Sequence, residues 1–235
     1  MRRALRITGT VLVVAGVALL AWAATVWAWQ DPFTKLYTAY EQRQLAEDYH
    51  DRAASFALPP PAATASPSDR ARAIATAARR YRRSLDEGDA LGRIRIPRMG
   101  VNMVVVEGTD HDSLKRGPGH YRGSFLPGEH RLVYIAGHRT TYGAPFSAID
   151  SLRAGDRVEL ELPYGTFEYR VTGHRIVEAD ALEVLRPGTR EVLALQACHP
   201  RFFASHRWIA YARPVRVVPR GGPAYAPALA ASATG

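Results

Sequence analysis

The sequence predicts an all-β domain, built as a closed or sandwiched sheet, in the C-terminal part of the chain. From Leu91 onward, short alternating or β-branched segments are separated by Gly and Pro, a spacing typical of strands joined by tight turns. Long helical patterns do not alternate with these segments, which argues against a parallel α/β sheet. The expected strands are Arg93–Ile96, Asn102–Val106, Leu132–Ala136, Arg157–Leu162, Thr166–Val171, Val192–Ala197 and Arg207–Val218.

An apolar helix is expected at the N-terminus. The 23 residues from Ile7 to Trp29 carry no charge, and at about 1.5 Å per helical residue they exceed the roughly 30 Å hydrocarbon core of a bilayer. Three arginines in residues 1–6 precede this stretch and favour a cytoplasmic N-terminus. A cleaved signal peptide, with Ala21–Ala23 as its small-residue site, is the alternative, but the stretch is longer than the usual h-region. We therefore expect a retained single-pass anchor at residues 7–29, in the cell membrane, with the rest of the chain extracytoplasmic.

A stem and linker are expected between the anchor and the β domain. Phe33 to Asp48 has apolar residues near helical spacing, and Ala57–Pro67 is a Pro/Ala/Ser spacer that should be extended. A second helix is expected from Ser68 to about Leu85, with the cluster Arg79–Arg83 on a solvated face. The predicted organisation is a stem at residues 30–90, a β domain at 91–219 and a flexible tail at 220–235.

Charge and motif content limit the partners and cofactors that this protein is expected to bind. The formal net charge is +9, and +6 remains without the three N-terminal arginines; spread over solvated faces, this charge favours an anionic cell surface only weakly. The sequence has no aromatic and basic motif for nucleic acid. It also lacks the HExxH and CxxC spacings of metal sites. No nucleic acid, metal ion or cofactor is therefore expected.

The single cysteine, Cys198, ends the apolar run Val192–Ala197. In an exported chain it has no internal partner for a disulfide, which makes a free reactive thiol plausible. A thiolate nucleophile needs an imidazole nearby, and His138 follows an expected strand and opens a Gly-containing loop. His199 and His206 are closer in sequence, but His199 would point to the opposite side of the strand from Cys198.

Arg207 opens the apolar strand that follows Cys198. Its guanidinium could donate hydrogen bonds to a substrate carbonyl or to a developing oxyanion. A strand-edge arginine in a surface ion pair is the alternative.

Together these features resemble a sortase, one of the membrane-anchored cysteine transpeptidases of Gram-positive cell walls. The likeness covers roughly Leu91 to Pro219 and rests on a strand that ends in Cys198, a short loop, Arg207, and a histidine about 60 residues upstream. It is most like the class E sortases of actinobacteria in the segments His138–Phe146, Gly92–Pro97 and Gly117–Tyr121.

The resemblance implies an eight-stranded sortase β-barrel with short helices, and catalytic roles for Cys198, His138 and Arg207. It implies cleavage of a Leu-Ala/Pro-x-Thr-Gly sorting signal between Thr and Gly through a Cys thioacyl intermediate. The expected partners are secreted proteins that bear this signal, an amine of a lipid II-like peptidoglycan precursor, and the membrane. Class E likeness suggests Ala at the second position of the signal, and Tyr142, close to His138, is the candidate for lining that pocket.

One departure from the family pattern concerns the residues before the cysteine. The family has Thr-Leu-x-Thr-Cys, whereas this chain has Ala194 and Ala197 in place of the two threonines; Ala197 would then line the substrate site without a hydroxyl. Two other functions stay open. One is another cell-wall cysteine enzyme, of the L,D-transpeptidase or NlpC/P60 type, although the residue order argues against both. The other is a degenerate, non-catalytic barrel that binds peptides or wall polymer.

Overall fold

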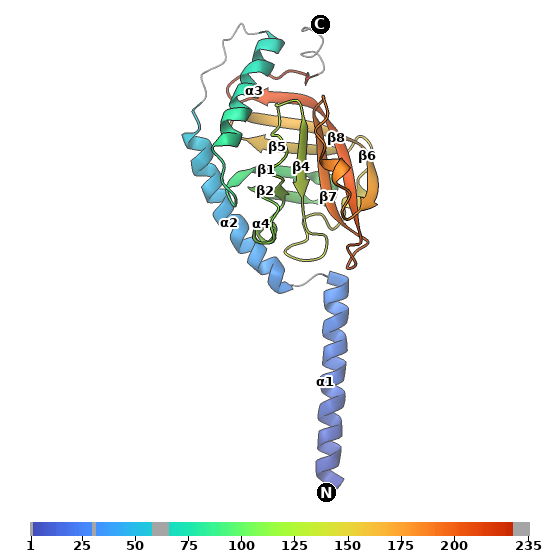
Figure 1. The fold of residues 1–235 in the computed structure, drawn as a ribbon. Helices are drawn as coiled ribbons and strands as arrows, with labels where there is room; N and C mark the ends of the chain where they lie inside the picture. Colours follow the sequence, from blue (N-terminus) through green and yellow to red (C-terminus); the bar gives the residue numbers. More distant parts are fainter. Residues whose placement is uncertain (1, 30–31, 58–65, 228–235) are drawn as a thin grey trace.

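The computed structural model describes residues 2–29, 32–57 and 66–227. Three helices precede a β-barrel: α1 (Arg2–Trp29), α2 (Pro32–Ser55) and α3 (Pro67–Arg83). Helix α1 projects away from the barrel, whereas α2 and α3 lie along it (Figure 1). Within α1, Arg2–Thr25 is long and apolar enough to cross a membrane, and none of its most apolar window is buried by the protein.

The barrel closes in the order β1-β2-β3-β4-β7-β8-β6-β5, which confirms the eight-stranded all-β prediction. Six of the neighbouring pairs are antiparallel, and β2 with β3 and β4 with β7 are parallel. The strands are β1 (Ala90–Ile96), β2 (Val101–Glu107), β3 (Gly119–His120), β4 (Leu132–Ala136), β5 (Arg157–Leu162), β6 (Gly165–Glu178), β7 (Val192–His199) and β8 (His206–Pro219).

Short elements fill the connections between strands. They are α4 (His111–Arg116) and the 3₁₀ turns η1 (Pro97–Met99), η2 (Ile149–Ser151) and η3 (Leu182–Leu185). Two of the short elements are not among those expected from the sequence. They are β3, formed by Gly119 and His120, and the turn η2. Both elements are too short for a sequence period to reveal.

Helix α3 is part of the folded core. It begins at Pro67, one residue earlier than expected, because Ser66 and Asp69 form a capping box. Ile74 and Tyr81 are buried, and the Tyr81 hydroxyl donates to the Leu91 carbonyl over 2.8 Å. The Arg79–Arg83 cluster is therefore not one solvated face, since the middle residue, Tyr81, is 0% exposed.

Helix α2 covers the outside of β1 and β2. Its Leu45 and Tyr49 share a buried cluster with Val104 and Val106. The Gln42 side-chain amide receives a hydrogen bond from the Val104 nitrogen over 2.7 Å and donates to the Val104 carbonyl over 3.0 Å. The helix expected at Phe33–Asp48 thus extends to Ser55 and packs on the barrel.

The two segments expected to be irregular are described only in part. Most of the Pro/Ala/Ser spacer, residues 58–65, lies outside the described residues, as does 228–235. Tyr225, within the expected tail, is buried and exchanges two backbone hydrogen bonds of 2.9 Å with Val217. The chain beyond residue 219 is therefore attached to β8 at this point.

Candidate active site

Strand order brings the three predicted catalytic residues to one end of the barrel. Strands β4 and β7 are parallel neighbours, with Ala136 beside Gln196, and the Gly137 nitrogen extends this ladder by donating to the Gln196 carbonyl over 2.9 Å. His138 and Cys198 each follow two residues after this pair, so both lie at the same end of the sheet. Strand β8 lies on the other side of β7 and pairs Arg207 directly with Cys198.

Cys198 lies on the outer face of the sheet. Leu193, Leu195 and Ala197 belong to the interior cluster of the barrel, whereas Ala194 belongs to a separate cluster on the other face. Because side chains alternate along a strand, Cys198 shares the face of Ala194. This outer cluster also contains Leu132, Tyr134, Val177 and Ile209, with Tyr121, Val184, Leu185 and Tyr211 packed against it. The thiol thus lies on the same face of the sheet as a buried apolar cluster.

Ala197 lies in the barrel interior. It is 1% exposed and belongs to the interior cluster, and it pairs with Trp208 of β8. Its methyl group therefore points away from the face that carries Cys198. This placement does not support the expectation that Ala197 lines the substrate site.

His138 is half-buried and has an unengaged ring nitrogen. Its Nε2 is buried and has no hydrogen-bond partner among the described residues. Burial lowers the pKa of His138 below its usual 6.5, and the nearby His111 lowers it further. The imidazole is therefore mainly neutral at pH 7, with Nε2 available to a thiol or a substrate.

The loop that carries His138 is fixed against α2. The Tyr142 ring lies 5.2 Å from the His138 ring, centroid to centroid, and meets the Tyr37 ring edge-on at 6.4 Å. The Tyr142 nitrogen also donates to Thr34 Oγ1 over 3.0 Å. Tyr142 thus links the histidine loop to the first turns of α2, in addition to its predicted role in a substrate pocket.

Arg139 is a buried residue that sequence reasoning missed. Its Nη2 donates to Asp150 Oδ2 over 2.6 Å, and its Nη1 approaches the Cys198 carbonyl at 3.2 Å and His199 Nδ1 at 2.9 Å. Burial lowers the Arg139 pKa, but the guanidinium remains a cation. Arg139 therefore connects the histidine loop to the end of β7. Only its position next to His138 in the sequence could have pointed to it.

One terminal nitrogen of the Arg207 guanidinium, Nη1, faces the β7–β8 loop. Nη1 donates to the carbonyls of Ala204 over 2.7 Å and His206 over 3.0 Å. A guanidinium has five N–H donors, so others remain for a ligand. The neighbouring histidines have different partners: His199 contacts Arg139, and His206 Nε2 lies 3.2 Å from Glu178 Oε1. Across residues 2–29, 32–57 and 66–227, no group of three or more His, Cys, Asp or Glu could hold a metal ion.

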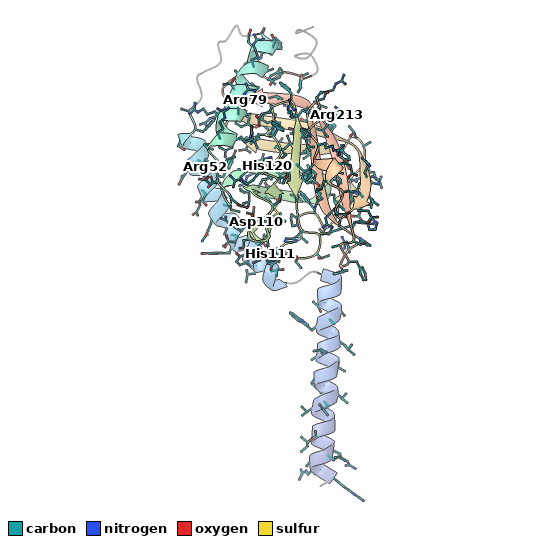
Figure 2. The ribbon with its side chains drawn as sticks, viewed as in Figure 1. Arg52, Arg79, Asp110, His111, His120 and Arg213 are labelled. Atoms are coloured by element: carbon teal, nitrogen blue, oxygen red, sulfur yellow. The ribbon has the colours of Figure 1, made fainter. Side chains whose placement is uncertain are left out.

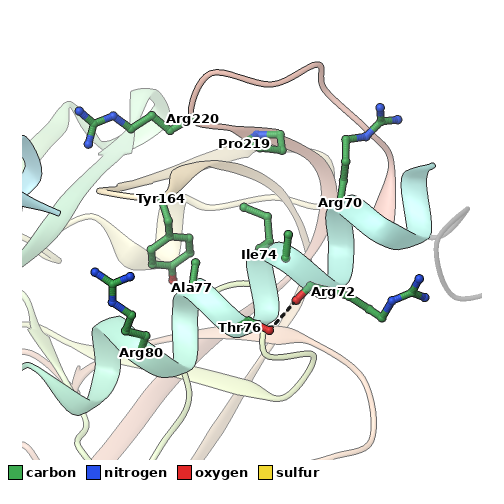
Figure 3. Close-up of a pocket in the computed structure, with 10 residues that line it drawn as sticks. Arg70, Arg72, Ile74, Thr76, Ala77, Arg80, Tyr164, Pro219 and Arg220 are labelled. Carbon is green, nitrogen blue, oxygen red and sulfur yellow. Dashed lines mark hydrogen bonds between the residues drawn. The ribbon is translucent and has the colours of Figure 1, made fainter. Parts of the chain in front are cut away.

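A separate cavity of about 380 Å³ lies between α3 and the end of β8. Ile74, Ala77 and Tyr164 line it, and Arg70, Arg72, Arg80 and Arg220 surround it (Figure 3). Pro219, at its edge, is the last residue of β8, whereas Arg207 is near the first. The cavity is therefore remote from Cys198 and forms no part of the candidate active site.

A thiol, an imidazole and a guanidinium at the ends of three neighbouring barrel strands define a candidate centre for acyl transfer through cysteine. Residues 94–215 match the sortase domain family. The chain belongs to the sortase family, whose members are cysteine transpeptidases.

Individual relatives agree with this assignment. Sortase D of Bacillus subtilis is 34% identical over 134 residues, which cover 55% of this chain and 66% of that protein. Sortase E of Streptomyces avermitilis is 34% identical with a TM-score of 0.52, over 59% of this chain and 97% of that structure. Sortase E1 of Streptomyces coelicolor, solved with a tripeptide in its active site, is 27% identical with a TM-score of 0.53, over 58% and 95%. The chain spans between 44% and 66% of the curated relatives it matches.

Proposed function

We propose that this chain is a membrane-anchored sortase that cleaves a Leu-Ala/Pro-x-Thr-Gly sorting signal between Thr and Gly and transfers the protein to a cell-wall precursor amine. The observation that carries the proposal is the register of β4, β7 and β8, which brings His138, Cys198 and Arg207 to one end of the barrel. The likeness to sortase E structures supports class E and an Ala-containing signal.

In the first step, Cys198 Sγ bonds to the carbonyl carbon of the signal Thr as the thiolate. The Thr–Gly C–N bond breaks, and His138 in its protonated form gives a proton to the departing glycine amine. The product is a thioester between Cys198 and the Thr carbonyl. Because burial lowers the pKa of His138, only a minor fraction carries this proton at pH 7 before substrate binds.

In the second step, an amine of a peptidoglycan precursor attacks the thioester carbonyl. Neutral His138 accepts the proton of the amine, and Cys198 leaves as the thiolate. Both steps place negative charge on the carbonyl oxygen, and the free donors of Arg207 would stabilise it. Tyr142, whose ring lies 5.2 Å from that of His138, is the candidate for lining the pocket of the second residue of the signal.

The anchor is α1, which would keep the N-terminus in the cytoplasm and the barrel outside the cell. Its length and composition fit a membrane span, and the arginines before it favour this orientation. A reporter fused after Gly235 should therefore be extracytoplasmic. A mature N-terminus near Ala24 in membrane-free medium would show a cleaved signal peptide instead.

Mass spectrometry of products tests the proposed reaction. The full chain, in detergent or lipid nanodiscs, would be incubated with LAxTG and LPxTG peptides and an amine, with Cys198→Ala as the control. Helix α2 is kept, since it packs on β1 and β2 and touches the histidine loop. Transfer or hydrolysis at the Thr–Gly bond supports the proposal. Binding without turnover would identify a degenerate barrel, and cleavage at another bond would identify a different peptidase.

A further inference from the structure

Four large apolar side chains are strongly exposed at the end of the protein where the histidine loop lies. Leu36 and Tyr40 on α2 are 72% and 58% exposed, and Phe202 and Phe203 in the β7–β8 loop are 56% and 81% exposed. We call these four residues the apolar rim. Large apolar side chains that are exposed on neighbouring elements mark a candidate binding surface.

The histidine loop brings the two parts of the rim to the same end of the barrel. On one side, the Tyr142 nitrogen donates to Thr34 of α2. On the other side, Arg201 Nη2, next to Phe202, donates to the Ser147 carbonyl in the same loop. Figure 1 shows the start of α2 and the β7–β8 loop both directed toward α1.

The short connection between α1 and α2 keeps the apolar rim close to the end of α1. Helix α1 ends at Trp29 and α2 begins at Pro32, so three Cα–Cα steps of 3.8 Å separate the two helices by at most about 11 Å. Leu36 follows four residues into α2, or roughly 6 Å further along the helix axis. A bilayer spanned by α1 would therefore have its surface near the rim.

We propose that the apolar rim inserts into the membrane interface and holds the mouth of the active site against the lipid surface. This inference rests on the proposed function of α1 as an anchor. Exposed Lys35 lies beside Leu36, and exposed Arg201 lies beside Phe202, so each apolar pair has a cation that can face anionic headgroups. Amphipathic elements with aromatic residues and flanking basic residues bind at this depth.

A protein partner at the rim is the other occupant to consider. The observations favour lipid because the short connection to α1 leaves little room between the rim and the bilayer. A lipid surface also does not require a docking site of a particular shape, and this agrees with a rim that is formed by two separate elements.

Nitroxide labels on the full chain in vesicles test this inference. Vesicles of phosphatidylcholine and phosphatidylglycerol would carry the Cys198→Ala chain with one new cysteine at a time: Phe203→Cys, Leu36→Cys, Val14→Cys in α1, or Arg79→Cys. Arg79 is exposed on α3 and lies far from α1 (Figure 2). Power saturation compares how oxygen, which partitions into lipid, and a water-soluble nickel chelate reach each label, and circular dichroism verifies the fold.

We expect the labels at 203, 36 and 14 to be more accessible to oxygen than to the nickel chelate. We expect the label at 79 to be more accessible to the nickel chelate than to oxygen. If the label at 14 is in lipid but the label at 203 or 36 behaves like that at 79, the rim does not dock and the anchor stands. If the label at 14 also behaves like that at 79, the proposed anchor fails as well. Rim labels that stay in water but become immobile when a sorting-signal peptide is added would assign the rim to the peptide.

Discussion

The guanidinium of Arg139 donates a hydrogen bond to the main-chain carbonyl of Cys198 over 3.2 Å. The same side chain binds Asp150 and His199, so one buried cation joins the loop after β4 to the end of β7. The relative position of His138 and Cys198 therefore depends on Arg139, even though its side chain is not expected to touch substrate.

Arg139→Lys should lower kcat by roughly ten- to a hundredfold with a smaller change in KM, because an ammonium cannot span three partners and a small misplacement of reacting groups is costly. The free energy of unfolding should fall by roughly 1–3 kcal/mol, because the side chain at this buried position would lose hydrogen bonds that lysine cannot replace. Steady-state kinetics and thermal unfolding measure the two effects. The control is Arg153→Lys on the exposed surface, and equal behaviour of the two variants would rule out the positioning role.

Cys198→Ala should abolish both cleavage and transfer, since Cys198 is the single cysteine of the chain. His138→Ala should be almost as severe, because the same imidazole gives a proton in one step and takes one in the other. Residual turnover above about a thousandth of wild type in Cys198→Ala would place the nucleophile elsewhere. His199→Ala and His206→Ala are the matched controls, and a greater loss in either would mean that His138 is not the acid and base.

Arg207→Lys should lose most of the activity although the positive charge is kept. A lysine cannot bind the Ala204 and His206 carbonyls and at the same time direct a planar fork to substrate. The measurement is kcat/KM on LAxTG and LPxTG peptides. A fully active lysine variant would show that Arg207 only supports the β7–β8 loop and takes no part in the reaction.

Tyr142→Ala should raise the pKa of His138 toward 6.5. The lowered value arises mainly from burial, and the ring of Tyr142 is one of the groups that cover the imidazole. Because the pKa of His138 is lower in the folded state, the unfolded chain binds this proton more tightly than the folded chain does. The contribution of His138 to stability is therefore present above about pH 6.5, and it is lost as the pH falls from there toward the lowered pKa of the folded state.

The titration of the His138 ring protons by NMR, compared between wild type and Tyr142→Ala, measures this change. The loss of stability between neutral and acidic pH should also be smaller in Tyr142→Ala than in wild type. An unchanged titration curve for His138 would show that other groups bury the imidazole.

Ala197→Thr should destabilise the protein and leave kcat/KM no higher than in wild type. The added atoms enter a packed interior, which costs roughly 1–3 kcal/mol, and the hydroxyl is buried in an apolar cluster. Ala197→Val has nearly the same shape without the hydroxyl and separates the two effects in thermal unfolding. A 2- to 13-fold rise in kcat/KM with Ala197→Thr would instead show that the site lacks a helpful hydrogen bond.

Much of the barrel could be predicted because its strands alternate apolar and polar residues between Gly and Pro turns. Strand β3 escaped prediction because two residues cannot show a period. Helix α3 was misjudged for a different reason: its Ala and Arg composition is typical of a solvated helix. Its burial depends on contacts with residues distant in sequence, such as Tyr164, whose ring lies 5.9 Å from that of Tyr81.

The candidate site, like the barrel, could be predicted only in part. Residue types pointed to Cys198, His138 and Arg207, but their closeness depends on β4 lying beside β7, 60 residues later in the chain. Local sequence contains no information on such pairing. The links from Arg139 to Cys198 and from Thr34 to Tyr142 likewise join segments that only the fold brings together.

The closure of the barrel limits how a peptide can be held. Up to Gln196, strand β7 has β4 on one edge and β8 on the other, so its main-chain groups are paired there and a peptide cannot bind along residues 192–196 by strand addition. The backbone of an extended peptide must instead find its donors and acceptors in loops and in side chains such as Arg207. Sequence preference would then be set by the loops around the end of the barrel, and exchanging those loops between related barrels should transfer specificity without disturbing the sheet.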